Sequence, residues 1–270
     1  MDRLDRNRAK PGGFTLIELL VTVAIIATVM AILLVALAQI RGRGDAVVCA
    51  SNVRNLITAA TAYAVDQSNY FPPAHIDFST TNLHRWHGTR ESTSQPFDFD
   101  GSPLRDYLQT PQITECAVFD PFDSGEVGQW GMRFEESAGG YGYNARLGSR
   151  PGNENRPVRL SEVRAPGRTL AFSDTAFARS ATGDDPDNTV VIEYSFMAAP
   201  HIVFPDGRKH PAVPSIHFRH DDRANVARVD GSVRAEAFEW TYPPHDFYKG
   251  DNEAVRIGWF GPRDNTLFDP

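Results

Sequence analysis

Cysteine is scarce in this chain, which has only Cys49 and Cys116 among its 270 residues. The two are too far apart for a Cys-x-x-Cys redox motif, and they lack the closely spaced partners that a zinc finger or zinc ribbon needs. Two states fit the sequence. If the domain lies outside the cytoplasm, the pair can form one disulfide, which would stabilise the fold by about 4 kcal/mol. Otherwise both are unpaired thiols, with Cys49 on a helix face.

The local signatures of common enzyme classes are also missing. The sequence has no Gly-x-Ser-x-Gly nucleophile turn, no phosphate-binding loop, no His-Glu-x-x-His helix and no dinucleotide-binding glycine pattern. We therefore expect no catalytic activity and no cofactor. A cell-surface enzyme is an alternative that would need polar residues from distant segments to converge in one pocket.

Positive charge is in deficit, with 27 Lys and Arg residues against 34 Asp and Glu residues and a formal net charge of −7. The first thirteen residues contain four basic and two acidic side chains, a balance of +2 that leaves −9 for the rest of the chain. No basic stripe interleaved with aromatic residues is present. This acidic body argues against a nucleic-acid partner.

Charge is almost absent between Phe14 and Ile40, where Glu18 is the only charged residue. As a helix this segment would be about 40 Å long, more than the roughly 30 Å hydrocarbon core of a bilayer. We therefore expect it to meet a membrane. The basic residues before it predict a cytoplasmic N-terminus and a translocated body. An acidic residue costs roughly 2.5–3.5 kcal/mol at mid-membrane, so Glu18 indicates a function.

Three interpretations of the apolar segment compete. It can be a plain signal anchor, or a cleavable secretory signal whose small-x-small site is Ala36-Leu37-Ala38, which would release a soluble product. The apolar stretch is longer than the usual signal, and Glu18 opposes both interpretations. The third interpretation explains the carboxylate.

Residues 13–20, Gly-Phe-Thr-Leu-Ile-Glu-Leu-Leu, resemble the leader junction of type IV prepilins and type II secretion pseudopilins. The resemblance implies that a membrane-embedded prepilin peptidase cuts between Gly13 and Phe14 and methylates the new amine of Phe14. It also implies that Glu18 pairs with that amine on a neighbouring subunit, because an unpaired charge in a low dielectric is costly. Many relatives carry a proline near the position of Val35, and its absence here removes a usual cause of a helix kink.

The rest of the chain predicts an α+β, pilin-like fold. Apolar residues from Val48 to Ala64 recur at three-to-four spacing, which extends the helix to about residue 69, before Pro72 and Pro73. Short β-type runs follow at residues 168–174, 189–196, 224–230, 232–240 and 254–260. We expect one long helix packed on an antiparallel sheet. The predicted organisation is a leader (1–13), a transmembrane and assembly helix (14–40), its amphipathic continuation (41–73) and a globular α+β domain (74–270).

A second resemblance concerns the C-terminal third. Asp230-Gly231 separates two β-prone runs and predicts a two-residue type I′ hairpin. His220 precedes it by nine intervening residues, and the stretch resembles the His-x9-Asp-Gly motif of a large bacterial family with prepilin-type leaders. Residues 141–144 and 164–174, and Cys49 with Asn52, also match that family, which implies a Cys49–Cys116 disulfide, although Ala117 replaces a frequent proline. We interpret His220 and Asp230 as a structural hydrogen bond, with a contact to a partner or ion as the alternative.

Metal sites receive little support from the sequence. Histidines occur at i, i+3 spacing twice, but the second pair is predicted at a strand end, where such positions face opposite sides. The weak calcium candidates are three carboxylates in one loop, because calcium prefers oxygen ligands, although the EF-hand spacing is missing. The residues concerned are His84 with His87, His217 with His220, and Asp184, Asp185 and Asp187.

The sequence therefore predicts a prepilin-like subunit of a type IV pilus or type II secretion pseudopilus. Its expected partners are prepilin peptidase, other pilin or pseudopilin subunits and the inner membrane. It is expected to span the inner membrane once, with the domain in the periplasm or outside the cell. The alternative is a secreted or membrane-anchored binding module that uses a prepilin-type or Sec-type leader without assembling into a filament.

Overall fold

The computed structural model describes residues 15–75, 81–108, 115–122, 135–149, 156–183, 185–204, 206–243 and 248–270, with only the backbone for 35–41. The chain divides into two compact units, Met1–Arg43 and Gly44–Pro270. The boundary falls between Gly42 and Gly44, where glycine lowers helix propensity by about 1 kcal/mol per residue.

Helix α1 covers Leu16–Asp66 and belongs to both units. The sequence predicted a helix from about 15 to 69, and the structure ends it three residues earlier. Ser68 and Asn69 both have positive φ angles, 52° and 72°. The Asn69 N–H donates to the carbonyl of Ala64 at 2.8 Å, a left-handed helix ending that satisfies one of the last carbonyls.

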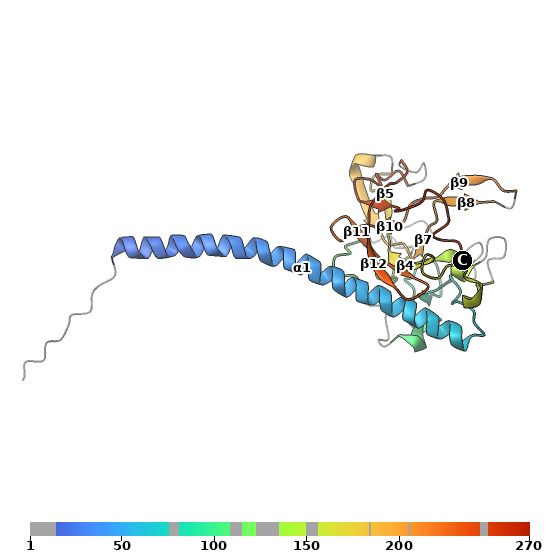
Figure 1. The fold of residues 1–270 in the computed structure, drawn as a ribbon. Coiled ribbons are helices and arrows are strands. Elements are labelled where there is room, and N and C mark those ends of the chain that lie inside the picture. Colours follow the sequence, from blue (N-terminus) through green and yellow to red (C-terminus); the bar gives the residue numbers. More distant parts are fainter. Residues whose placement is uncertain are drawn as a thin grey trace, which may run out of the picture. The chain divides into compact units, whose positions relative to one another are not determined.

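The globular unit is built on a five-stranded sheet in the order β12-β11-β4-β3-β7. Figure 1 labels β12, β11, β4 and β7 of this sheet. All neighbours are antiparallel except β3 and β7, which are parallel. The predicted α+β class with a long N-terminal helix is confirmed, with a mixed sheet in place of a purely antiparallel one. The strands are β3 (Tyr141–Asn144), β4 (Leu170–Asp174), β7 (Phe196–Met197), β11 (Arg223–Arg228) and β12 (Val233–Ala237).

Small two-stranded sheets and single helical turns surround this sheet. The pairs are β1 (His84–Arg85) with β2 (Gly88–Thr89), β5 (Phe177–Ser180) with β6 (Thr189–Ile192), β8 (His201–Val203) with β9 (Lys209–Pro211), and β10 (Ile216–His217) with β13 (Ile257–Gly258). The turns are η1 (Phe99–Gly101), η2 (Arg105–Tyr107), α2 (Ala145–Gly148), η3 (Leu160–Glu162) and η4 (Pro186–Asn188).

Apolar side chains cover both faces of the sheet. Ala227 of β11 belongs to the cluster that includes the α1 residues Val53 and Ile57, whereas Val226 belongs to a second cluster around Trp259. Adjacent strand residues point to opposite faces, so this division places two layers on the sheet. All five residues of β4 are accordingly buried.

Strand β3 was missed because its segment, Gly139 to Asn144, reads as a glycine-rich turn. All four of its residues are buried, and Tyr143 stacks on Phe172 with ring centroids 4.8 Å apart. A Cβ on Gly142 would lie 2.5 Å from the Thr175 side chain. The glycine therefore permits close packing at a buried strand, and tertiary packing overrides its low β-propensity.

The predicted hairpin is present, but its turn type was wrong. β11 and β12 pair antiparallel, and Gly231 has a φ of 83° while Asp230 is not among the positive-φ residues. A type I′ turn needs positive φ at both central positions. The Arg228 N–H donates to the Ser232 carbonyl at 2.9 Å, and the Gly231 N–H donates to the Arg228 carbonyl at 2.9 Å. This is a longer loop with glycine alone in the left-handed region.

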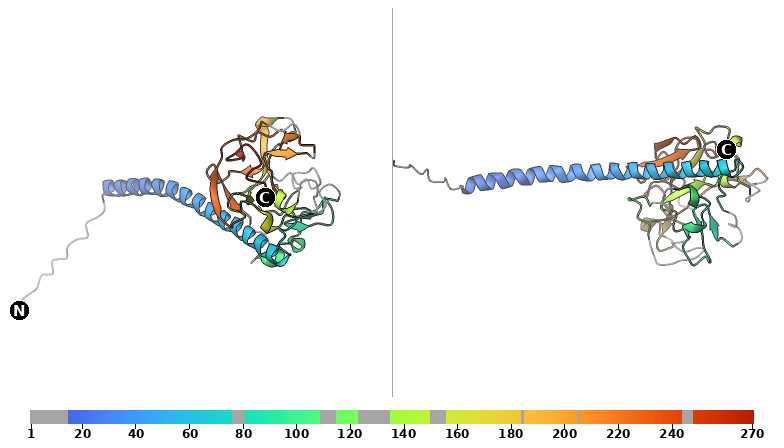
Figure 2. Two further views of the ribbon diagram at one scale, coloured as in Figure 1. Left: turned by 45° about the vertical axis from the view of Figure 1, so that its right-hand side comes forward. Right: turned by 90° about the horizontal axis from the view of Figure 1, so that it is seen from below.

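The end of the chain is fixed on the domain. The Asn144 amide donates to the Leu170 carbonyl at 2.8 Å and to the Phe268 carbonyl at 3.0 Å. The C-terminal residues therefore run back over the globular unit, as both further views also show (Figure 2). Asn144 belongs to the segment 141–144 that carried the family resemblance, and its role here is structural.

Candidate functional site

The N-terminal part of α1 is long and apolar enough to cross a membrane, by length and composition. The span Leu16–Leu34 has a mean hydropathy of 2.7, and none of it is buried within the structure. Leu16, for example, is 78% exposed. A continuous apolar surface of this extent is stable only when lipid or other protein covers it.

Glu18 closes a hydrogen-bonded cap at the start of this helix. The Thr15 N–H and hydroxyl each donate to Glu18 Oε2 at 2.8 Å, and the Glu18 N–H donates to Thr15 Oγ1 at 3.2 Å. This is a reciprocal capping box, which satisfies helix N–H groups that have no intrahelical acceptor. The Thr-x-x-Glu pattern before an apolar run was readable from the sequence and was missed. The cleavage and methylation positions, Gly13 and Phe14, lie outside the described residues.

Cys49 and Cys116 form a disulfide in the globular unit, with their Cα atoms 5.3 Å apart. Cys49 lies on α1, and Cys116 lies in the segment before β3, where its N–H donates to the Gly139 carbonyl at 3.1 Å. Both side chains are buried, at 0% and 1% exposure. The disulfide therefore fixes the second part of α1 to the segment that precedes β3 of the central sheet.

His220 lies against this disulfide. Its Nε2 atom is 3.5 Å from Cys116 Sγ and 3.4 Å from Asp174 Oδ2. The imidazole ring of His220 is positioned by a tight turn in which Asp221 and Asp222 both have a φ of 57°. Asp174 ends β4 and accepts a hydrogen bond from the Asn225 N–H at 2.7 Å. The disulfide, imidazole and carboxylate thus form one buried group, called here the His220 cluster: Cys49, Cys116, Asp174 and His220.

Polar side chains around the His220 cluster tie neighbouring segments together. Arg219 donates to the carbonyls of Gly140 at 2.7 Å and Thr175 at 2.8 Å, and its guanidinium lies 4.2 Å from the centroid of the Phe119 ring. Burial lowers the pKa of Arg219, although the nearby charge of Asp174 opposes this. This cationic side chain places positive charge near the cluster.

Residues that carried the second resemblance converge at this place. The Asn52 amide donates to the Tyr141 hydroxyl at 3.0 Å, and burial raises the pKa of that hydroxyl. Asn52 lies one turn after Cys49 on α1, and Tyr141 begins β3. The residues that carried the second resemblance therefore lie together beside the His220 cluster, which their spacing along the chain did not predict.

The proposed hydrogen bond between His220 and Asp230 is wrong. The two residues flank β11, whose six residues span roughly 20 Å. Asp230 instead accepts hydrogen bonds from the Ser232 N–H at 2.9 Å and hydroxyl at 2.6 Å, which lower its pKa. Asp230 and Gly231 shape the hairpin, whereas the partner of His220 is Asp174.

One of the three weak calcium candidates has a structural role. Asp185 caps η4 by accepting a hydrogen bond from the Asp187 N–H at 3.0 Å, and Asp184 lies outside the described residues. Among the residues that the structure describes, one group of three or more metal-ligating side chains has its ligand atoms within 4.8 Å of one another. It consists of Cys49, Cys116 and His220.

A second buried polar group surrounds Glu135. Arg85 donates to its carboxylate at 2.8 Å, and both side chains are almost fully buried. Burial alone would raise the pKa of Glu135, but the charge of Arg85, the hydrogen bonds from Arg85 and the nearby His87 ring lower it to about 2. The Ser195 hydroxyl also donates to this carboxylate at 2.5 Å. These contacts join Arg85 of β1 and Ser195, the residue before β7, through the Glu135 carboxylate.

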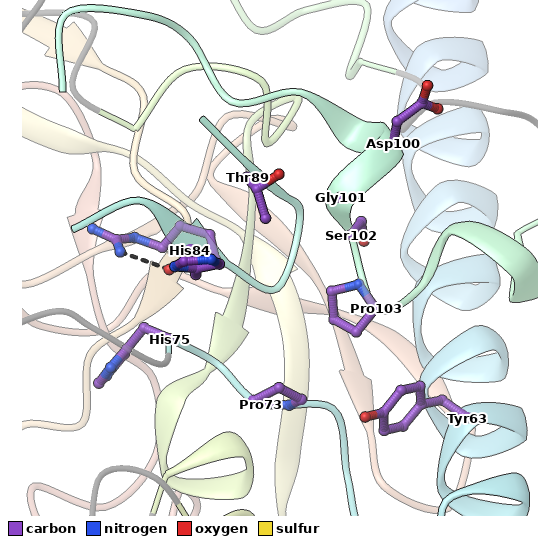
Figure 3. A pocket seen from close by; sticks show the side chains of 10 residues that line it. Tyr63, Pro73, His75, His84, Thr89, Asp100, Gly101, Ser102 and Pro103 are labelled. Carbon is purple, nitrogen blue, oxygen red and sulfur yellow. Dashed lines mark hydrogen bonds between the residues drawn. The ribbon is translucent and has the colours of Figure 1, made fainter. Parts of the chain in front are cut away.

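A shallow cavity of about 330 Å³ lies beside this group (Figure 3). Its walls come from the end of α1, the segment after it, the β1–β2 hairpin and η1. Arg85, one of its lining residues, donates to the His84 carbonyl at 2.9 Å. The lining residues are Tyr63, Pro73, His75, His84, Arg85, Thr89, Asp100, Gly101, Ser102 and Pro103.

We expect the buried Glu193 carboxyl to make the stability of the domain depend on pH. Burial raises its pKa to about 7 from 4.5, although N–H groups of Gly140 and Ser137 donate to it. The folded state therefore retains a proton that the unfolded state loses. The stabilisation is fully present below about pH 4.5 and is lost as pH rises through about 7, a loss of about 3 kcal/mol. We expect Glu193→Gln to flatten this dependence in chemical unfolding measured from about pH 5 to 8.

Glu253→Gln is the matched control for this prediction, because Glu253 is exposed and its side chain makes none of the described contacts. It should retain the wild-type slope. A Glu193→Gln protein whose stability still falls with rising pH like the wild type would show that another group causes the dependence.

The comparisons with known proteins concern the N-terminal segment. Residues 8–37 match the family described as the prokaryotic N-terminal methylation motif. No curated protein and no solved structure matches the chain. The chain thus carries a prepilin-type leader, of the kind that prepilin peptidase processes, followed by an apolar helix suited to membrane anchoring. This supports a type IV pilin-like or pseudopilin-like protein.

Proposed function

We propose that this chain is a filament subunit, inserted with its N-terminus in the cytoplasm, cut between Gly13 and Phe14, and methylated at Phe14. Its α1 helix then assembles into a type IV pilus or a type II secretion pseudopilus. The observation that carries the proposal is the methylation motif at residues 8–37, continuous with an apolar helix that has no cover within the chain. The domain after residue 73 faces the periplasm or exterior.

The hydrogen bonding of Glu18 supports its proposed role in assembly. Within the described residues, both bonds to its carboxylate go to Oε2, and an ionised carboxylate can accept about four. Oε1 therefore has capacity for a further donor. In a membrane, the cationic amine of Phe14 on a neighbouring subunit would supply that donor and neutralise the charge.

The proposed activity is assembly by packing. Helices that leave lipid for a filament exchange lipid contacts for helix–helix contacts and an ion pair. We accordingly propose no catalytic step and no cofactor. The domain would contact cargo or sister subunits, and prepilin peptidase and other pilin or pseudopilin subunits are the partners.

Blocking the leader cut tests this function. Gly13→Arg should prevent trimming, so the chain should stay in the membrane fraction and be absent from sheared filaments on immunoblots. Asn7→Arg is the matched control, because it adds the same charge away from the junction, and it should behave like the wild type. Equal recovery of the Gly13→Arg chain from filaments would contradict the proposal.

The cavity beside η1 favours the second candidate, an anchored or secreted binding module (Figure 3). If the chain has that function, the wild-type protein would be trimmed normally and would still be absent from filaments. The wild-type lane of the same experiment separates the two functions.

A further inference from the structure

The His220 cluster gathers four side chains of the types that hold zinc in proteins. The ligand atoms of Cys49, Cys116 and His220 all lie within 4.8 Å of one another. Asp174 adds a carboxylate 3.4 Å from the same imidazole nitrogen. All four residues are buried, with at most 8% exposure. Two thiolates, an imidazole and a carboxylate form a donor set that zinc accepts in tetrahedral sites.

Two edges of this group already have the lengths that tetrahedral zinc requires. With Zn–S near 2.3 Å and Zn–N and Zn–O near 2.0–2.1 Å, sulfur and nitrogen lie about 3.5 Å apart and nitrogen and oxygen about 3.3 Å apart. The observed separations are 3.5 Å from Cys116 Sγ to His220 Nε2 and 3.4 Å from His220 Nε2 to Asp174 Oδ2. The two sulfur atoms must move apart, to about 3.8 Å. Asp174 must also approach the sulfur atoms, because it does not belong to the group whose ligand atoms lie within 4.8 Å of one another.

We propose that reduction of the Cys49–Cys116 disulfide converts the His220 cluster into a binding site for one Zn²⁺ ion, with Cys49, Cys116, His220 and Asp174 as ligands. A dithiol reductant supplies two electrons and two protons, which break the S–S bond and give two thiols while the reductant forms its own disulfide. Zinc binding then displaces both thiol protons. The disulfide and the metal site are alternative states of one position.

The surroundings fit an anionic metal centre. Asp174 Oδ1 is buried and has no hydrogen-bond partner among the described residues, whereas Oδ2 is held by the Asn225 N–H at 2.7 Å. Two thiolates and one carboxylate around Zn²⁺ leave a net charge of −1. The Arg219 guanidinium, which donates to the Gly140 and Thr175 carbonyls from the residue next to His220, supplies a positive charge that offsets it.

Cobalt titration of the full chain in detergent tests the site, because Co²⁺ replaces zinc and gives visible absorption bands in tetrahedral thiolate sites. The oxidised chain should bind none at this position. The chain reduced with a phosphine and freed of it under argon should bind one equivalent with those bands, and one equivalent of Zn²⁺ should remove them. Circular dichroism follows the fold throughout. A reduced chain, folded or unfolded, that gains no tetrahedral bands with added Co²⁺ would overturn the proposal.

Substitution of His220 tests whether its imidazole is a ligand of the bound metal. His220→Gln should weaken Co²⁺ binding by the reduced chain at least about tenfold and shift its absorption bands. His217→Gln is the matched control, since His217 is a second, partly buried histidine whose Nδ1 has no partner among the described residues. It should leave both the affinity and the spectrum unchanged. Identical titrations for His220→Gln and the wild type would also overturn the assignment.

Discussion

Glu18→Ala is expected to leave leader trimming intact and to remove the chain from sheared filaments. In the proposed function, trimming depends on the junction before Phe14, whereas assembly would place the Phe14 amine of one subunit in an apolar environment. Without the carboxylate that amine has no counter-charge, and an unpaired charge in hydrocarbon costs several kcal/mol. Immunoblots of membrane and sheared fractions measure the effect, with the size shift of the trimmed chain as the internal check.

Thr15→Val is the matched control for the assembly role of Glu18. It removes the hydroxyl that takes part in the capping box but keeps the carboxylate. We expect reduced helix capping and continued incorporation into filaments. Undiminished incorporation of the Glu18→Ala chain would refute the ion-pair role, and equal loss for both variants would reduce that role to helix capping.

The second large effect concerns the disulfide. Replacing both Cys49 and Cys116 by serine is expected to lower the free energy of unfolding of the domain by about 4 kcal/mol. The bond joins residues 67 positions apart, and a closed loop of that length restricts the unfolded chain by about this amount. Urea unfolding followed by the fluorescence of buried tryptophans, such as Trp86, measures the change.

Ser51→Ala is a control on the same part of α1, because Ser51 is exposed, and it should change the stability by less than about 0.5 kcal/mol. A double serine variant as stable as the wild type would show that packing around Cys49, and not the covalent bond, holds α1 to the sheet.

The elements that the sequence predicted well are those whose signal is local. The apolar period predicted from Val48 to Ala64 gives the buried side of α1, although Val48 itself is 50% exposed. The β-prone runs on either side of Asp230-Gly231 mark β11 and β12. Strand β3 escaped prediction because glycine is weak evidence for a strand, and only the packed environment of Gly142 makes it favourable there.

The His220 cluster could not be predicted from spacing along the chain. Its members come from α1, from the segment before β3, from the end of β4 and from the turn before β11. The motif itself misled, because nine residues that include a strand lie between His220 and Asp230. Extended backbone separates its two ends, and the partner of His220 is therefore a residue of a neighbouring strand.

Cleavage at the leader junction decides whether the mature chain keeps its apolar helix. The decisive measurement is mass spectrometry of the N-terminal peptide of the chain isolated from its native membranes or filaments. We predict a chain that begins at Phe14 with one methyl group on its amine and retains the whole of α1. A chain that begins at Gln39, after the small-x-small site, would have lost the apolar helix and with it the basis for assembly.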